Sequence, residues 1–185
     1  MKIEMNRLHL FILLFAASSL LFQFPPGAFA VDDITATDAE TDGVNGFTEL
    51  DGARGVATFT IGSSTYAIVA SIYDNGVQII DVSDPENIVA TDAETDGANG
   101  FDELTGATGV ATFTIGSSTY AIVTGYTDYG VQIIDISDPT NIVAKDSETD
   151  GVNGFDELDG ATGVDTFVIG SSTYAIVAGF NGNGV

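Results

Sequence analysis

The stretch "FTIGSSTYAIV" at positions 59–69 decides the expected fold, because it returns unchanged at 113–123 and as "FVIGSSTYAIV" at 167–177. The copies are 54 residues apart, and 42 of the 54 positions in 38–91 are identical to their counterparts in 92–145. Self-similarity at a period of this size is typical of chains built from repeated supersecondary units. We therefore interpret the chain as a tandem repeat.

Each repeat is predicted to form four short strands. β-Branched and aromatic residues alternate with turns rich in Gly, Asp, Asn and Pro, and no segment has a sustained helical period. The second strand is apolar on both faces, which indicates a sheet covered on both sides. Such four-stranded antiparallel sheets are typical of β-propeller blades; a β-solenoid is the alternative, but its coils are usually shorter. In the first repeat the strands are expected at 55–61, 65–71, 77–82 and 87–94.

The repeats predict an all-β chain. It is expected to have an opening outer strand at 33–40, blades at about 55–94 and 109–148, and a partial blade at 163–185. Propellers usually close with about 4–8 blades. We therefore expect an incomplete propeller, either as a fragment of a longer product or as a piece that needs further repeats or chains to close a ring.

A family resemblance follows from the third strand of the repeat. "GVQIIDVSDP" (76–85) and "GVQIIDISDP" (130–139) resemble the LVIVD repeat, a β-propeller repeat of secreted and surface proteins from microbes, and the resemblance extends over 31–185. It implies a propeller fold and a surface location, and the family has no single activity. The chain departs from the family pattern at Gln78 and Gln132, which replace an apolar residue, and in its longer connector, "ETDGVNGFTELDGARG".

The first thirty residues are predicted to be a signal peptide. Lys2 and Arg7 precede the apolar run "LHLFILLFAASSLLF" (8–22), and "AFA" (28–30) resembles a cleavage site. A single-pass anchor is the alternative, although the run is shorter than the roughly 20 residues that span a bilayer. No second run of this length follows. We expect cleavage after Ala30, a secreted or cell-surface chain of residues 31–185, and no membrane span after cleavage.

The composition of residues 31–185 excludes several kinds of chemistry. This part has 26 acidic residues against Arg54 and Lys145, a net charge of −24, and it has no Cys, His, Met or Trp. It therefore lacks a disulfide framework, the usual general base and the thiol nucleophile. Nucleic acid would be repelled, because it requires a basic surface. No cofactor is expected, although the acidity suits calcium or a saline medium.

The connector between repeats has the spacing of a calcium loop. Acidic residues stand at its positions 1, 3, 5 and 12, with glycine at position 6, as in a helix–loop–helix calcium site. Position 3 is a long Glu, position 8 is Asn and no helices flank the loop, so a solvated acidic row that protects a sheet edge is the favoured alternative. The candidate calcium ligands are Asp38, Glu40, Asp42 and Glu49, then Asp92, Glu94, Asp96 and Glu103, then Asp146, Glu148, Asp150 and Glu157.

The turn between the second and third strands is the candidate binding face. Five of the six positions in 70–75 differ from 124–129, and in an antiparallel sheet this turn is expected on the same side as the acidic connector. Relaxed constraint on an exposed turn explains the variation equally well. Phe47, Phe101 and Phe155 are expected to anchor the connector instead. The candidate binding residues are Tyr73, Asp74, Asn75, Tyr126, Asp128, Tyr129, Phe180 and Asn181.

These features favour a secreted, non-enzymatic binding or scaffold protein of the cell surface, with an unidentified protein or glycan as its partner. The alternatives are a calcium-dependent hydrolase on a propeller and a purely structural repeat protein. A fold alone does not decide between them.

Overall fold

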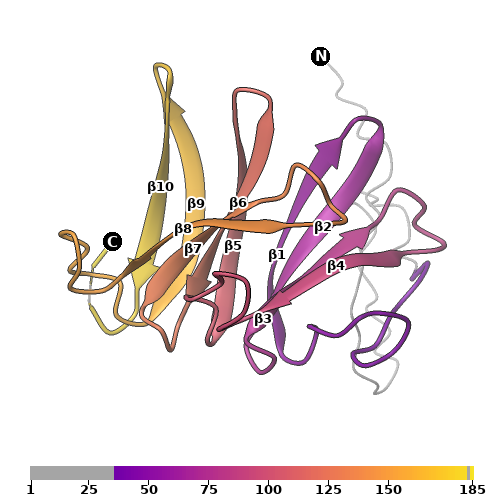
Figure 1. Cartoon of the computed structure of the whole chain (residues 1–185), viewed down its shortest axis with the longest axis horizontal. Helices are drawn as coiled ribbons and strands as arrows, with labels where there is room; N and C mark the ends of the chain where they lie inside the picture. Colours follow the sequence, from indigo (N-terminus) through magenta and orange to yellow (C-terminus); the bar gives the residue numbers. More distant parts are fainter. Residues whose placement is uncertain (1–35, 183) are drawn as a thin grey trace, which may run out of the picture.

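The computed structural model describes residues 36–182 and 184–185, and within them the chain is all-β, with strands and turns but no helix (Figure 1). This confirms the expected all-β class and the expected antiparallel four-stranded units. The first sheet has the order β1-β2-β3-β4, the second has the order β5-β6-β7-β8, and β9 and β10 form a hairpin. The strands are β1 (Ala53–Ile61), β2 (Ser64–Ser71), β3 (Gly76–Asp81), β4 (Val89–Thr95), β5 (Ala107–Ile115), β6 (Ser118–Gly125), β7 (Gly130–Asp135), β8 (Val143–Thr149), β9 (Ala161–Ile169) and β10 (Ser172–Gly179).

The local sequence explains these strands and their turns. A two-residue turn joins β1 to β2, and Gly62 occupies it with a φ of 62°, a conformation that glycine adopts without strain. The central strands β2 and β3 are almost wholly buried, whereas the outer strand β4 is half-exposed. The second strand is therefore apolar because it is buried in the middle of the sheet, and the fourth carries acidic residues because it lies at the outer edge, as the sequence predicts.

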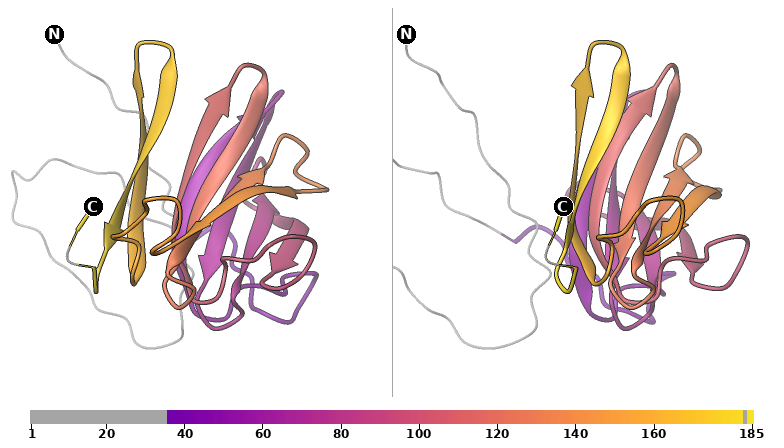
Figure 2. Two further views of the ribbon diagram at one scale, coloured as in Figure 1. Left: turned by 60° about the vertical axis from the view of Figure 1, so that its left-hand side comes forward. Right: turned by 90° about the vertical axis from the view of Figure 1, so that its left-hand side faces the viewer.

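The three sheets stack face to face, with their first strands β1, β5 and β9 side by side (Figure 2). The largest core lies between the first two sheets and joins Phe59, Ile68 and Ile79 of one to Val123 and Ile134 of the other. Two threonine hydroxyls also bridge neighbouring sheets: Thr112 donates to the carbonyl of Thr58, and Thr166 donates to that of Thr112. Packing between repeats therefore provides most of the core.

Two buried glutamines attach the long connector to its sheet. Gln78 accepts a hydrogen bond from the Thr48 amide at 3.0 Å and donates one to the Asp92 carbonyl at 2.7 Å. Gln132 makes the equivalent bonds to the Asp102 amide and the Asp146 carbonyl. The polar residue in the third strand and the long connector are thus parts of one structural feature.

The phenylalanine anchors differ between the repeats. Phe47 and Phe101 are 1% and 0% exposed, as expected for residues that hold the connector against a sheet. Phe155 is 42% exposed, because β9 and β10 are the only strands of the third repeat that the described residues contain. The anchoring role is confirmed in the two repeats that have four strands.

The amino-terminal predictions fall partly outside the described residues. The signal peptide (1–30) and residues 33–35 of the expected opening strand lie there. Residues 36–40 are described and form no strand, and within the described ranges the third repeat has only β9 and β10, so it offers no third strand to pair with them. In the described part of the chain, no helix is long and apolar enough to cross a membrane. The sheets of this part also do not close into a ring.

Candidate binding face and the carboxyl groups beside it

The turn between the second and third strands lies directly against the acidic connector. In the first repeat the Tyr73 amide donates to the Asp51 carbonyl at 3.2 Å, and the Asp51 amide donates to the Asp74 carboxylate at 2.6 Å. In the second repeat, the Thr105 amide donates to the Asp128 carboxylate, also at 2.6 Å. These contacts bring the variable turns and the connectors to one edge of the molecule, which we call the variable edge (residues 72–75, 126–129 and 180–182, with 50–52, 104–106 and 158–160).

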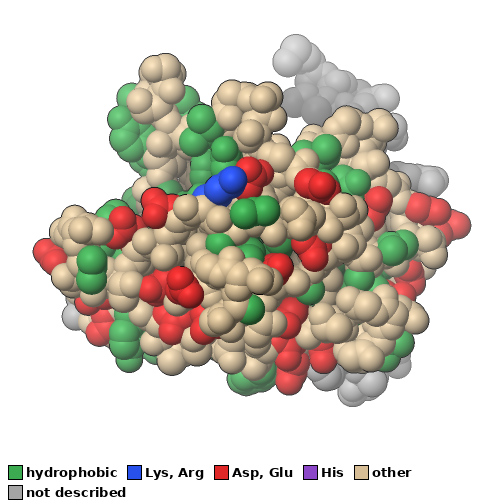
Figure 3. Space-filling view, in the orientation of Figure 1, with side chains coloured by type: hydrophobic (Ala, Val, Ile, Leu, Met, Phe, Trp, Pro, Cys, Tyr) green, Lys and Arg blue, Asp and Glu red, His purple; other side chains and the backbone are tan. Residues whose placement is uncertain are grey.

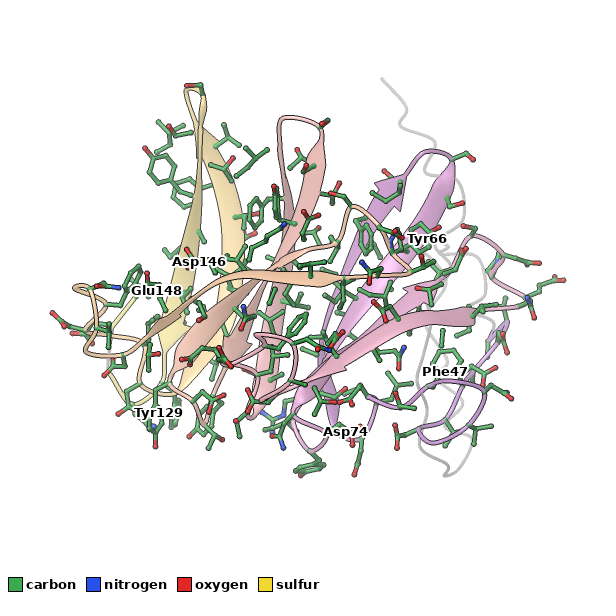
Figure 4. The ribbon with its side chains drawn as sticks, viewed as in Figure 1. Phe47, Tyr66, Asp74, Tyr129, Asp146 and Glu148 are labelled. Carbon is green, nitrogen blue, oxygen red and sulfur yellow. The ribbon has the colours of Figure 1, made fainter. Side chains whose placement is uncertain are left out.

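Aromatic side chains project from the variable edge. Tyr73 and Phe180 are 70% and 71% exposed, Tyr129 is 45% exposed, and Tyr126 is half-buried. Figure 4 shows Tyr129 and Asp74 along this edge, whereas Tyr66 lies away from it. Tyr66 instead stacks on Phe59, with ring centroids 5.5 Å apart. The exposed aromatic side chains of the variable edge therefore differ from Tyr66, which packs within the first sheet.

The backbone at Tyr129 is strained. Its φ is 61°, in the left-handed region that a bulky side chain rarely adopts. The equivalent Asn75 has a φ of 59°, which asparagine tolerates, and its side chain accepts a hydrogen bond from the Gly106 amide at 2.8 Å. Tyr129 thus costs conformational energy and gives up a polar contact that the first repeat has. Strain of this kind, held by surrounding structure, concentrates at functional sites.

We expect Tyr129→Asn to raise the free energy of unfolding by about 1 kcal/mol, because it removes the strain and restores an acceptor for the Gly160 amide. Urea unfolding followed by circular dichroism measures the change. Asn75→Tyr is the reciprocal variant and should lower stability by a similar amount. A Tyr129→Asn variant that is less stable than the parent would show that the tyrosine serves the fold.

Beside the variable edge, one buried glutamate in each complete repeat has an unsatisfied oxygen. Glu49 is 8% exposed; its Oε1 accepts a hydrogen bond from the Thr95 hydroxyl, and its Oε2 has no partner. Glu103 is 7% exposed and has the same arrangement with Thr149. Burial raises the pKa of each glutamate, and nearby carboxylates raise it further: Asp74 and Asp42 act on Glu49, and Asp128 and Asp96 act on Glu103.

Asp74 and Asp128 belong to the same two groups of carboxyls. Burial raises the pKa of Asp74, and the adjacent Asp42 carboxyl raises it further, although the hydrogen bond from the Asp51 amide acts in the opposite direction. Asp128 shows the same raised pKa beside Asp96. Figure 3 shows acidic side chains scattered over the face in view and one small basic area. Residues 31–185 contain only Arg54 and Lys145 as basic residues, so few cations offset these groups. Lys145, the only cation with an ion pair among the described residues, contacts Asp135 at 3.4 Å.

The residues that the calcium spacing grouped have different hydrogen-bond partners, although positions 5 and 12 interact as neighbouring carboxyls. Position 1 of the loop binds backbone amides of the following turn: Asp38 accepts from Ile88, and Asp92 accepts from Ile142. Position 3 accepts from the position-8 asparagine, position 5 accepts from a leucine amide, and position 12 is the buried glutamate. In the second repeat, Glu94, Asp96 and Glu103 accept hydrogen bonds from the equivalent partners.

In the third repeat, position 1 (Asp146) accepts from the amide of Ser147, position 3 (Glu148) from Asn153 and position 5 (Asp150) from Leu158, while position 12 (Glu157) is exposed. Over the described ranges, no group of three or more acidic or histidine side chains is arranged to hold a metal ion. Eleven of the twelve acidic residues accept hydrogen bonds that shape the connector. The roles of Glu49 and Glu103 with Asp74 and Asp128 could not be read from the loop spacing, because the aspartates come from a different turn.

Comparison with models of known protein families finds no match, and comparison with the sequences of curated proteins finds none. The variable edge and its carboxyl groups must therefore be interpreted from their own chemistry.

Proposed function

We propose that the chain is a secreted, non-enzymatic binding or scaffold protein of the cell surface, built from propeller repeats of the LVIVD type, and that the variable edge is its binding face. The carrying observation is that exposed aromatic side chains stand at the turns that vary most between repeats, on a backbone fixed by stacked sheets. Large amphipathic rings on a rigid support lose little entropy on binding. The strained Tyr129 supports the same face.

The chemistry of the face suits a partner with cationic or hydroxyl-rich groups. Asp51, Asp74 and Asp128 lie beside the aromatic residues, so a polyanionic ligand would be repelled. Sugar rings stack on exposed aromatic faces, and cationic groups are attracted by both the rings and the carboxylates. A protein or glycan of the cell envelope offers these groups.

The test measures retention of the fluorescently labelled chain on envelopes of the producing cells. We expect the triple variant Tyr73→Ser, Tyr129→Ser and Phe180→Ser to bind about tenfold more weakly or worse. Val89→Ser with Val143→Ser is the matched control, since these exposed valines lie on the outer strands β4 and β8. Protease-treated envelopes distinguish a glycan from a protein partner. Equal retention of the triple variant and the parent would overturn the assignment of this face.

A further inference from the structure

The interface between the first two sheets defines two complementary faces in each repeat. One face of the first sheet presents Phe59, Ile68, Val77 and Ile79, and we call its equivalent in any repeat the trailing face. It covers the leading face of the second sheet, which presents Val110, Ala121, Val123 and Ile134. The trailing face of the second sheet covers the leading face of the β9–β10 hairpin in the same way. Within the chain, a leading face is therefore covered by the trailing face of the preceding repeat.

Among the residues that the structure describes, no sheet covers the leading face of the first sheet. It holds a groove of about 320 Å³ lined by Val56, Ala67, Val69, Ile80, Val82 and Ile88, with Arg54 at its margin. Val56 is 66% exposed, whereas the equivalent Val110 packs against the main core. This groove is the counterpart of the surface that the first sheet covers on the second sheet.

The trailing face of the β9–β10 hairpin is likewise uncovered by any described strand. Phe167 is 43% exposed and Ile176 is 46% exposed, whereas the equivalent Phe59 and Ile68 of the first sheet are 7% and 0% exposed. Ile169 and Tyr174 add 63% and 47% exposed side chains to the same face. An apolar face of this kind, in a chain that is otherwise strongly acidic, indicates an interaction surface.

We propose that the open trailing face of one copy of this chain docks onto the open leading face of a second copy, in the geometry that already joins consecutive repeats. A second copy fits both open faces, because the equivalent face 54 residues away is in each case covered by another repeat of the same sequence. The association is head-to-tail, so it forms a ring if the rotation closes and a filament if it does not.

Equivalent glycines mark the points where consecutive repeats approach each other most closely, and one of them predicts a specific contact between two copies. At Gly55 an added Cβ would lie within 3.0 Å of the Thr108 carbonyl, and at Gly109 within 3.0 Å of the Thr162 carbonyl, so the next repeat presses directly on both glycines. At Gly163 the nearest atom to such a Cβ is 4.0 Å away and belongs to Ala178 of the same hairpin. The carbonyl of Arg54 is equivalent to those of Thr108 and Thr162. In the proposed complex it packs against Gly163 of the other copy.

The charges at the two open faces are complementary. Arg54 stands where the other repeats have Thr108 and Thr162, and Asp165 stands where they have Ala57 and Ala111. Both side chains are exposed. When the Arg54 carbonyl sits on Gly163, Asp165 lies two residues along the same strand face, roughly 6.6 Å away and within reach of the guanidinium. The single basic residue of the first repeat thus meets an acid that is unique to the third.

The experiment measures molar mass by sedimentation over a wide range of protein concentration. We expect the parent to associate reversibly, and Val56→Glu and Ile176→Glu each to remain monomeric, because each places a charge in one apolar face. A mixture of these two variants should form a dimer that goes no further, because the mixture retains one intact leading face and one intact trailing face. Val89→Glu, an exposed valine on β4, is the matched control and should associate like the parent.

Two further variants test the specific contacts. Arg54→Asp should weaken association by about tenfold or more, and adding Asp165→Arg in the same chain should restore it. Gly163→Ala should weaken association without lowering the unfolding temperature of the monomer. A parent that stays monomeric at every concentration, or a mixture of Val56→Glu and Ile176→Glu that stays monomeric, would overturn the proposal. A symmetric dimer that only one of these two variants disrupts would overturn it equally.

Discussion

Replacing Gly109 by alanine is expected to lower the free energy of unfolding by about 3 kcal/mol, the upper end for overpacking a core. The new methyl group would lie within 3.0 Å of both the Thr162 carbonyl and the Thr124 hydroxyl. That hydroxyl already accepts from the Gly109 amide at 2.7 Å and donates to the Thr162 carbonyl at 2.9 Å. The backbone cannot yield locally, so the second sheet must move away from the hairpin.

Gly163→Ala is the matched control, because it makes the same change at the equivalent position of the next repeat. Nothing lies closer than 4.0 Å to the added methyl group, and its φ is outside the left-handed region. Monomer stability should therefore be unchanged or higher by about 0.4–1 kcal/mol, since alanine restricts the unfolded chain. Urea unfolding at low protein concentration measures both variants. Equal effects at the two positions would contradict the packing of β5 against β9.

The strands could be predicted from the sequence because each of their signals is local. The expected strand 55–61 corresponds to β1 (Ala53–Ile61), and 65–71 corresponds to β2 (Ser64–Ser71). Turn glycines and apolar runs fix these elements without reference to the rest of the chain. The repeat period then predicts that equivalent strands recur, as β5 and β6 do.

The candidate site was less accessible to sequence reasoning because it depends on contacts between separate segments. The variable turns could be found by comparing repeats, but the raised pKa of Glu49 depends on burial and on Asp74, which is 25 positions away. The calcium spacing counted positions 1, 3, 5 and 12 together, whereas the backbone directs Asp38 to the Ile88 amide and Glu49 to the Thr95 hydroxyl. Spacing along the chain does not report which way a connector turns.

Gln78 shows how an exception in the sequence can indicate a contact. A polar residue in an apolar strand must find partners when it is buried. The sequence shows both the exception and the unusually long connector, and the structure links them through the Thr48 amide. The partner itself could not be predicted, because it lies 30 positions away in a segment without regular structure.

Mild acid is expected to stabilise this protein, and Glu103→Gln is expected to reproduce that effect at neutral pH. The folded chain raises the pKa of Glu49, Glu103, Asp74 and Asp128, so it binds protons more tightly than the unfolded chain does. Their contribution to stability is therefore complete below the unfolded values, about 4.3 for Glu and 3.9 for Asp, and is lost as the pH rises through the raised folded values.

Two other aspartates set the lower limit of this stabilisation. Burial would raise the pKa of Asp135, but hydrogen bonds from Ser137 and the nearby Lys145 outweigh it and leave the pKa lowered. Hydrogen bonds from Thr140 lower the pKa of Asp138. A lowered pKa gives stability that is present above the unfolded value and is lost as the pH falls through the folded one. Stability should thus be highest in mild acid and should fall below about pH 3.5.

Glu103→Gln removes the buried charge while keeping the shape of the side chain. Its Oε2 has no partner, and both this atom and the Glu148 carbonyl oxygen lie beside Cα of Gly130, so we expect a glutamine amide at this position to donate to that carbonyl. At neutral pH we expect the free energy of unfolding to rise by about 1–2 kcal/mol, because an unsatisfied buried acceptor is replaced by a neutral donor. Stability should also depend less on pH between mild acid and neutrality, because Glu103 no longer contributes a titrating group.

Glu157→Gln is the matched control, because it makes the same substitution at the equivalent position of the third repeat, where the side chain is exposed. Urea unfolding at about pH 5 and at neutral pH separates the two variants, since only Glu103→Gln should bring the two midpoints closer together. A loss of stability at neutral pH in Glu103→Gln alone would mean that the ionised carboxylate is held by a favourable interaction, such as a bound cation. The carboxyl groups beside the variable edge would then be a site that recognises positive charge.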